Sequence, residues 1–186
     1  MGTAAKRRAT YADLVDVPDR LVAEIVAGEL VTSPRPGARH ARSASRLGDC
    51  LGGPFDRGAG GPGGWVILGE PELHLGTDAL VSDLAGWRRE RMPELPDVAA
   101  FELAPDWVCE VLSPSTEAHD RAAKMPAYAR EGVMWAWLVN PSNQTVEVFR
   151  LHDGAWLLHE THRGAAAAAI PPFDAVPLEL ALLWAR

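Results

Sequence analysis

The chain has 186 residues, of which 47% are hydrophobic and 23% are charged, so a disordered chain, a coiled coil and collagen are excluded over most of its length. Its formal net charge of −7 argues against a protein that coats nucleic acid through bulk charge, although a local basic groove is compatible with it. The sequence has two cysteines without CxxC spacing, no secretory signal pattern and no apolar run of about 18 residues, so we expect a cytoplasmic protein without a membrane segment.

We expect residues 1–10 to form a mobile tail and residues 11–186 to form a single domain, with its core at about 20–160. After a short helix, two strand-like runs on either side of Ala27-Gly28 predict an N-terminal β-hairpin. The next periodic segment, 40–51, predicts a helix closed by Gly52 and Gly53, and a flexible glycine-rich loop follows it.

Strands dominate the rest of the chain. A helix is expected over 117–131, with a kink at Pro126, and a last short helix at 178–184 follows the low-complexity linker 165–169. This order predicts an α+β (α/β) fold with one mixed β-sheet flanked by helices and a C-terminal β-meander. The strands are expected at 65–68, 72–75, 79–84 and 107–112, and those of the meander at 134–139, 145–151 and 155–161.

Two of the predicted strands carry a carboxylate on an apolar face. The period of two places Glu110 on the face of Val108 and Leu112, and Asp83 on the face of Val81. A buried carboxylate costs several kcal/mol unless it is paired or bound to a cation. A shared Mg²⁺ (or Mn²⁺), which takes carboxylate oxygens and leaves positions for water and phosphate, would satisfy both acids. Separate pairing with arginines would do so equally well, and the sequence leaves both readings open.

Lys124 is the third candidate for chemistry. Only two of the 18 basic residues are lysine, so a lysine here indicates a role for a compact ammonium, with chance as the alternative. Asp120, Lys124 and Tyr128 recur at steps of four along the predicted helix, next to an expected apolar stripe of Ala118, Ala122, Met125 and Ala129. The plain interpretation is a surface Asp120–Lys124 pair. In the functional one, Lys124 reaches toward Glu110 and Asp83, orients an attacking water and offsets charge on a phosphorane-like transition state.

Arginines supply candidate contacts to a nucleic-acid backbone. A first group recurs at steps of four, three and four, so that most of its members share one helix face, which is usually a solvated face. A second group lies in a proline-punctuated segment where a nearby tryptophan could stack on bases. The candidates are Arg35, Arg39, Arg42 and Arg46 in the first group and Arg88 and Arg89 in the second.

Several short motifs occur in an order that resembles a known family. They are Glu24 to Leu30, His40, Val81 to Trp87, Cys109 to Thr116, Asp120, Lys124, Tyr128, Gly132-Val133 and Trp137 to Pro141. This order resembles the Uma-two-type restriction endonucleases, a bacterial domain family of unknown function within the PD-(D/E)XK nuclease superfamily. The resemblance covers roughly residues 10–160, and its most specific part is EVLSPST followed by D-x-x-x-K. It implies a restriction-endonuclease-like core and Mg²⁺-dependent hydrolysis of phosphodiesters.

The resemblance also implies roles for individual residues. Asp83 matches the motif aspartate and Glu110 the second metal ligand. The superfamily places its lysine two residues after that acid, where this chain has Leu112, so Lys124 on the helix becomes the candidate. Ser82 replaces the proline usual before the aspartate. The accessory positions are Glu24, His40, Asp120 and Tyr128, with an accessory carboxylate and a phosphate or water contact as the expected roles of the first two.

These observations predict a Mg²⁺-dependent endonuclease that hydrolyses DNA. The alternative is a catalytically silent nuclease-fold module that binds nucleic acid or a protein partner, and hydrolysis of another phosphodiester is a third possibility. We also expect a homodimer, formed through the meander strands or through the apolar C-terminal segment 171–184.

Overall fold

The computed structural model describes residues 7–185. Part of the expected mobile tail, residues 1–6, lies outside that range. Residues 7–10 are held in place, because the Ala9 amide donates to the Gly28 carbonyl at 2.8 Å and Arg7 pairs with Asp13 at 2.6 Å. Within residues 7–185 no helix has the length and apolar character needed to cross a bilayer.

The expected N-terminal hairpin is confirmed. Helix α1 (Tyr11–Val15) precedes strands β1 (Leu21–Val26) and β2 (Glu29–Pro34), which pair antiparallel. The turn residues Ala27 and Gly28 both have positive φ, at 54° and 81°, which is the geometry that matches the twist of a two-residue hairpin. This hairpin joins β4 (Glu72–Leu75) and β5 (Asp78–Val81) in a four-stranded sheet of order β2-β1-β5-β4.

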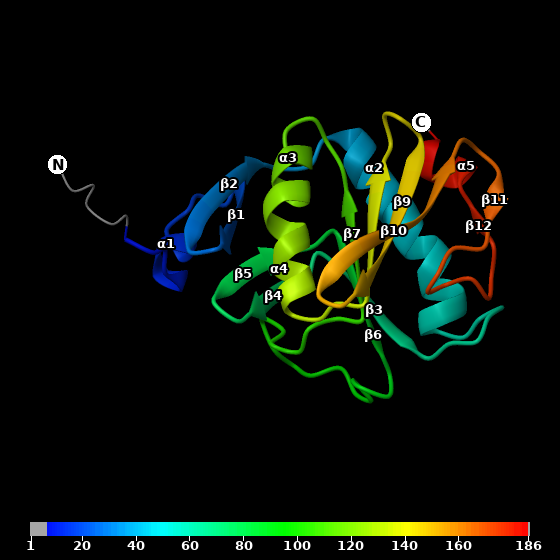
Figure 1. Cartoon of the computed structure of the whole chain (residues 1–186), viewed down its shortest axis with the longest axis horizontal. Coiled ribbons are helices and arrows are strands. Elements are labelled where there is room, and N and C mark those ends of the chain that lie inside the picture. Colours follow the sequence, from blue (N-terminus) through cyan, green and yellow to red (C-terminus); the bar gives the residue numbers. More distant parts are fainter. Residues whose placement is uncertain (1–6, 186) are drawn as a thin grey trace.

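A second, six-stranded sheet forms the centre of the molecule, so the expected single mixed sheet is in fact two principal sheets (Figure 1). Its order is β10-β9-β8-β7-β6-β3, and β7 and β8 run parallel because a helical crossover connects them. Strands β8, β9 and β10 form the predicted meander. The strands are β3 (Trp65–Gly69), β6 (Leu84–Arg88), β7 (Trp107–Val111), β8 (Trp135–Asn140), β9 (Thr145–His152) and β10 (Ala155–Arg163).

Helices cover both faces of the six-stranded sheet. The crossover between β7 and β8 consists of α3 (Glu117–His119), the π-helical segment η2 (Asp120–Lys124) and α4 (Met125–Arg130), and it packs on the face that includes Val108. Helix α2 (Ala38–Leu51) packs on the other face, against alternate residues of β7. Figure 1 shows the crossover helix in front of the sheet and α2 behind it.

Two predicted boundaries differ because of long-range contacts. The strand expected at 79–84 is divided between the two sheets, since β5 ends at Val81 and β6 begins at Leu84. Helix α2 does not stop at Gly52 but continues as the π-helical turn η1 (Gly52–Asp56), where Phe55 is buried in the core. The predicted flexible loop therefore begins with a packed turn.

The helix expected over 117–131 contains an unforeseen π-helical segment. Pro126 lies at the start of α4, directly after η2. A change of the backbone hydrogen-bond register at this point accommodates proline, which has no backbone N–H to donate.

The C-terminal segment packs on its own chain. The stretch expected as a linker contains β11 (Ala167–Ala168), which pairs with β12 (Leu178–Glu179), and the last helix is only α5 (Ala181–Trp184). Phe173, Leu180 and Leu183 are buried beside α2 in the core of the same chain. These three side chains are therefore not available to a second subunit, whereas Leu182 is exposed.

Truncation of Trp137 tests this core. Its ring is buried against Trp107, at 5.2 Å between centroids, and its Nε1 donates to the Pro171 carbonyl at 2.8 Å. We expect Trp137→Ala to lower the free energy of unfolding by about 3–5 kcal/mol, measured by urea denaturation. Trp135→Ala, at a partly exposed ring on the same strand, is the matched control, and an equal loss in both variants would contradict this packing.

Candidate active site

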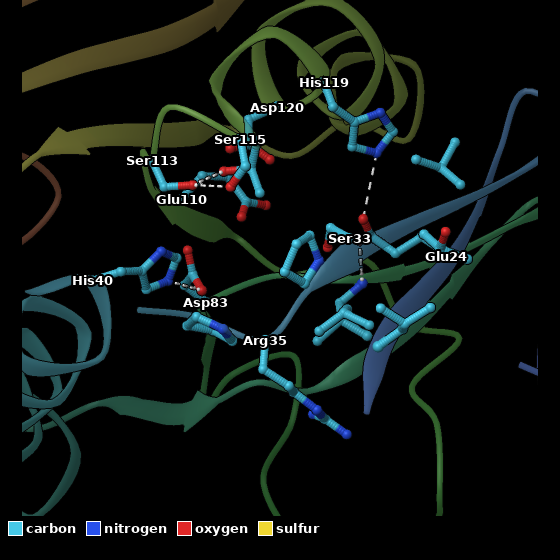
Figure 2. A pocket seen from close by; sticks show the side chains of 18 of the residues that line it. Glu24, Ser33, Arg35, His40, Asp83, Glu110, Ser113, Ser115, His119 and Asp120 are labelled. Atoms are coloured by element: carbon cyan, nitrogen blue, oxygen red, sulfur yellow. Dashed lines mark hydrogen bonds and ion pairs between the residues drawn. The ribbon is translucent and has the colours of Figure 1, made fainter. Parts of the chain in front are cut away.

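The candidate catalytic residues converge on one cavity of about 560 Å³. It lies between the β1–β2 hairpin, the junction of the two sheets and the start of the crossover helix (Figure 2). Tyr128 lies behind the cavity wall, where it contacts Glu110. The predicted catalytic and accessory residues that line the cavity are Glu24, His40, Asp83, Glu110, Asp120 and Lys124.

Lys124 lies at the centre of this group. Its Nζ is 2.9 Å from Glu110 Oε2 and 3.3 Å from Glu24 Oε1, and it donates to the Val81 carbonyl at 2.8 Å. Burial acts to lower the pKa of Lys124, but the charges of the surrounding carboxylates outweigh burial and raise it. The side chain is therefore an ammonium directed at the acids, not a surface partner of Asp120, whose Oδ1 is 3.9 Å away.

The crossover helix turns its polar stripe inward, whereas the expected apolar stripe is only partly buried, with Met125 in the core. Ala118 and Ala122 are exposed, whereas Asp120, Lys124 and Tyr128 are buried. A polar face can be buried here because each of these groups meets a charged or hydrogen-bonding partner inside the cavity or beside it.

Glu110 occupies the predicted face of β7, next to Val108 in the core under the crossover helix. Its Oε1 accepts a hydrogen bond from the Tyr128 hydroxyl at 2.6 Å, and its Oε2 faces Lys124. Burial raises the pKa of Glu110 well above its usual range, and the Lys124 ammonium opposes this rise. The charge of this carboxylate therefore depends on positive charge held close to it.

Asp83 lies at the junction between β5 and β6, not within a strand as predicted. Because Leu84 pairs antiparallel with Cys109, Asp83 lies across from Glu110 in the neighbouring strand. Its Oδ2 accepts from the Val111 amide at 2.6 Å, and its Oδ1 is 2.7 Å from His40 Nε2. The break between the two sheets thus directs this carboxylate into the cavity, and α2 supplies the histidine that orients it.

Among the described residues, neither Asp83 nor Glu110 contacts an arginine. The alternative in which each acid pairs with its own arginine is therefore not observed. Four carboxylates, those of Glu24, Asp83, Glu110 and Asp120, surround one lysine. No three His, Cys, Asp or Glu side chains within residues 7–185 are arranged as a complete metal site. The donors nevertheless fit Mg²⁺, because it prefers carboxylate oxygens and keeps several of its waters.

Glu24 connects the hairpin to Lys124. Its Oε1 accepts from the Val81 amide at 2.9 Å, and its Oε2 is 3.4 Å from His119 Nε2. Although burial acts to raise it, the pKa of Glu24 falls to about 2, because Lys124, His119 and the amide stabilise the carboxylate. A hairpin side chain therefore helps to hold the ammonium in place.

Sequence reasoning missed His119 and the hydroxyl groups of the EVLSPST turn. The Ser113 Oγ lies 3.0 Å from both the Ser115 and the Thr116 hydroxyl oxygens, and all three residues line the cavity. Thr116 occupies the N-cap position of α3. The only available signal was their presence in the most specific stretch of the family resemblance.

The candidate arginines separate into two places. Arg35 lines the cavity, and Arg39 and Arg42 are exposed on the first turns of α2, whereas Arg46 pairs with Asp49 at 3.4 Å. Arg88 and Arg89 do not line the cavity. Arg88 lies five residues along the chain from Asp83, which corresponds to about 17 Å of extended backbone. There the Arg88 guanidinium lies 4.7 Å from the centroid of the Trp65 ring, and Arg89 pairs with Asp56 at 2.9 Å.

Replacement of Glu24 tests the buried ion cluster. We expect Glu24→Gln to lower the free energy of unfolding at pH 7 by about 1.5–3 kcal/mol, because hydrogen bonds to a buried charge are lost. Glu117→Gln, which removes an exposed pair with Arg121, is the control and should cost about 0.5 kcal/mol or less. Equal losses in the two variants would contradict the arrangement.

The loss of stability in Glu24→Gln should also depend on pH. The pKa of Glu24 lies below its ordinary value of 4.5, so its contribution to stability is present above pH 4.5 and is lost as the pH falls toward about 2. The stability difference between the wild type and Glu24→Gln should therefore shrink over that window, as measured by urea denaturation at several pH values. A difference that stays constant down to pH 2 would contradict this.

Comparisons with known proteins agree with the architecture. The chain matches the model of the Uma2 family, described as "putative restriction endonuclease", over residues 9–182. A crystal structure described as a putative nuclease of DUF820, from Anabaena variabilis ATCC 29413, has the same fold, with a TM-score of 0.70 and 21% identity over 95% of this chain and 97% of the other. No curated protein matches. Because the family model spans nearly the whole sequence, the chain belongs to the Uma2 family of restriction-endonuclease-like proteins, as the order of its motifs indicated.

Proposed function

We propose that this protein is a Mg²⁺- or Mn²⁺-dependent nuclease that hydrolyses phosphodiester bonds in DNA. The observation that supports it best is that one cavity brings together two carboxylates, Asp83 from the junction before β6 and Glu110 from β7, with an ammonium 2.9 Å from Glu110. A buried lysine among acids at the floor of a cavity suits the chemistry of phosphoryl groups better than a purely structural role.

Asp83 and Glu110 would hold the metal ion. A bound Mg²⁺ supplies a Lewis acid that lowers the pKa of water and neutralises charge on the phosphate. Asp120 and Glu24 add negative charge around the same place, and both line the cavity with the two ligands. Without a cation this surplus of carboxylates would repel a phosphate, so metal dependence is part of the proposal.

The groups of the chain itself position the reactants. Lys124 orients the attacking water and offsets the charge that develops on the phosphoryl oxygens. It needs little rearrangement to do so, because Glu24 and the Val81 carbonyl already hold its ammonium. Tyr128 fixes Glu110, and His40 fixes Asp83, each through one hydrogen bond.

We also propose that two copies assemble as a homodimer in the cytoplasm. Because Phe173, Leu180 and Leu183 of the C-terminal segment are buried in their own chain, the meander is the surface we favour. Strand β10 is an edge strand of the six-stranded sheet and exposes Leu157 and Leu158.

Replacement of Lys124 tests the proposed chemistry. We expect Lys124→Gln to slow plasmid nicking in Mg²⁺ or Mn²⁺ by about 100-fold or more, because a preorganised charge at the transition state is lost. Glutamine retains much of the volume and a hydrogen-bond donor, and circular dichroism and thermal melting check that the variant folds. Arg121→Gln, on the solvent side of the same helix, is the control for a lost positive charge. Unchanged nicking by Lys124→Gln would refute the assignment.

Removal of the metal separates the nuclease from a silent nuclease-fold module. Treatment with EDTA should abolish nicking, and added Mn²⁺ should restore it. Asp83→Asn and Glu110→Gln should each weaken Mn²⁺ binding measured by calorimetry, whereas Glu72→Gln at the cavity wall should not. If the wild type binds DNA but does not cleave it with either metal, the silent module is the better description.

A further inference from the structure

The reactive groups lie at the floor of a small cavity. Its volume of about 560 Å³ falls in the range of pockets that enclose a small ligand, about 300–1,000 Å³, which is the size class of one or two nucleotides. The side chains of Glu110 and Lys124 are only 3% and 5% exposed, and that of Asp83 is 14% exposed. A phosphate must therefore enter the cavity to reach them.

Two separate parts of the chain form its walls. The hairpin contributes Val31 and Ser33 from β2, and the turn before α3 contributes Ser113 and Ser115 (Figure 2). Glu24, which is buried, holds the hairpin against Lys124 through a 3.3 Å ion pair. The hairpin wall is therefore part of the folded site, and a wide nucleic acid would have to displace it.

The cavity continues past the acids into a second hollow of about 370 Å³. Both share His40, Asp83 and Glu70 in their lining, so they meet beside the candidate metal ligand. Small side chains of α2 line the second hollow, among them Ala44 and Ser45. We treat the two hollows, which adjoin at Asp83, as one track for a bound strand.

The charges along this track suit a phosphate bound inside through a metal ion and further phosphates at the rim. Carboxylates predominate in the interior, with Lys124 and two histidines among them, whereas Arg35 is exposed and lines the cavity. Arginines at the rim can contact the phosphates that flank the scissile one.

From these observations we infer that the site takes a single, unpaired strand of nucleic acid rather than an intact duplex. This inference rests on the proposed nuclease function. In a duplex the phosphates lie on the outer surface of a wide and stiff helix, so a recess with walls on two sides admits one of them less readily than it admits the backbone of a flexible single strand. Enzymes whose target is out of reach in a duplex act on single strands or on nucleotides that leave the stack.

The experiment compares one labelled DNA strand in three forms: alone, fully paired, and paired except for a central bubble. With Mn²⁺ and the wild-type chain, we expect the single strand to be cleaved at least tenfold faster than the duplex, and cuts in the third form to be confined to the bubble. Cleavage of the duplex at an equal or higher rate would overturn the inference but leave the nuclease intact. Cleavage of none of the three would overturn the nuclease proposal and the inference with it. Lys124→Gln shows that any cutting belongs to this site.

Substitutions of residues that line the two hollows give a second, independent test of the inference. Ser33→Trp on the hairpin wall and Ser45→Trp in the second hollow should each slow single-strand cleavage at least tenfold by filling the path, without touching the acids or the lysine. Leu30→Trp, an exposed position of β2 outside the cavity, is the matched control and should stay within twofold of wild type. Melting temperatures verify that all three variants fold. Full activity of both track variants would overturn the proposed path of the strand.

Discussion

The architecture of the site depends on one buried ammonium. Lys124 has almost no contact with water, and it is held among Glu110, Glu24 and the Val81 carbonyl. Each of these charges would be very costly to bury alone, and each is acceptable only because the others are present. Since Glu24 comes from the hairpin sheet, Glu110 from the central sheet and Lys124 from the crossover helix, the same cluster that would serve catalysis also joins the three parts of the fold.

Asp83 owes its position to the break between strands β5 and β6. Had residues 79–84 continued as one strand, the side chain of Asp83 would have remained within a single sheet. The chain instead leaves β5 at Val81 and enters β6 at Leu84, and the carboxylate between them meets the Val111 amide and His40. The surplus of carboxylates over ammonium in the cavity gives this position its electrostatic character, which favours a hard divalent cation.

The errors of the sequence analysis have a common cause. A helix stripe of small apolar residues was expected to face the core, yet Ala118 and Ala122 are exposed and the stripe of Asp120, Lys124 and Tyr128 is buried. Hydrophobic periodicity assumes that the partner surface is apolar, and here it carries Glu110 and Glu24. In the C-terminal segment, Phe173, Leu180 and Leu183 pack into the core of the same chain, whereas Leu182 is exposed.

Local periodicity in the sequence was enough to predict the hairpin, the meander, the inward face of Glu110 and the shared stripe of Asp120, Lys124 and Tyr128, because each depends on residues that are close neighbours along the chain. Only the tertiary structure decided the division into two sheets, the pairing of His40 with Asp83 and the place of Glu24 and His119 around the lysine. These contacts join residues 43 positions apart for His40 and Asp83 and 57 positions apart for Glu24 and Val81. No local pattern encodes such separations, since they follow from how the sheets and helices pack together.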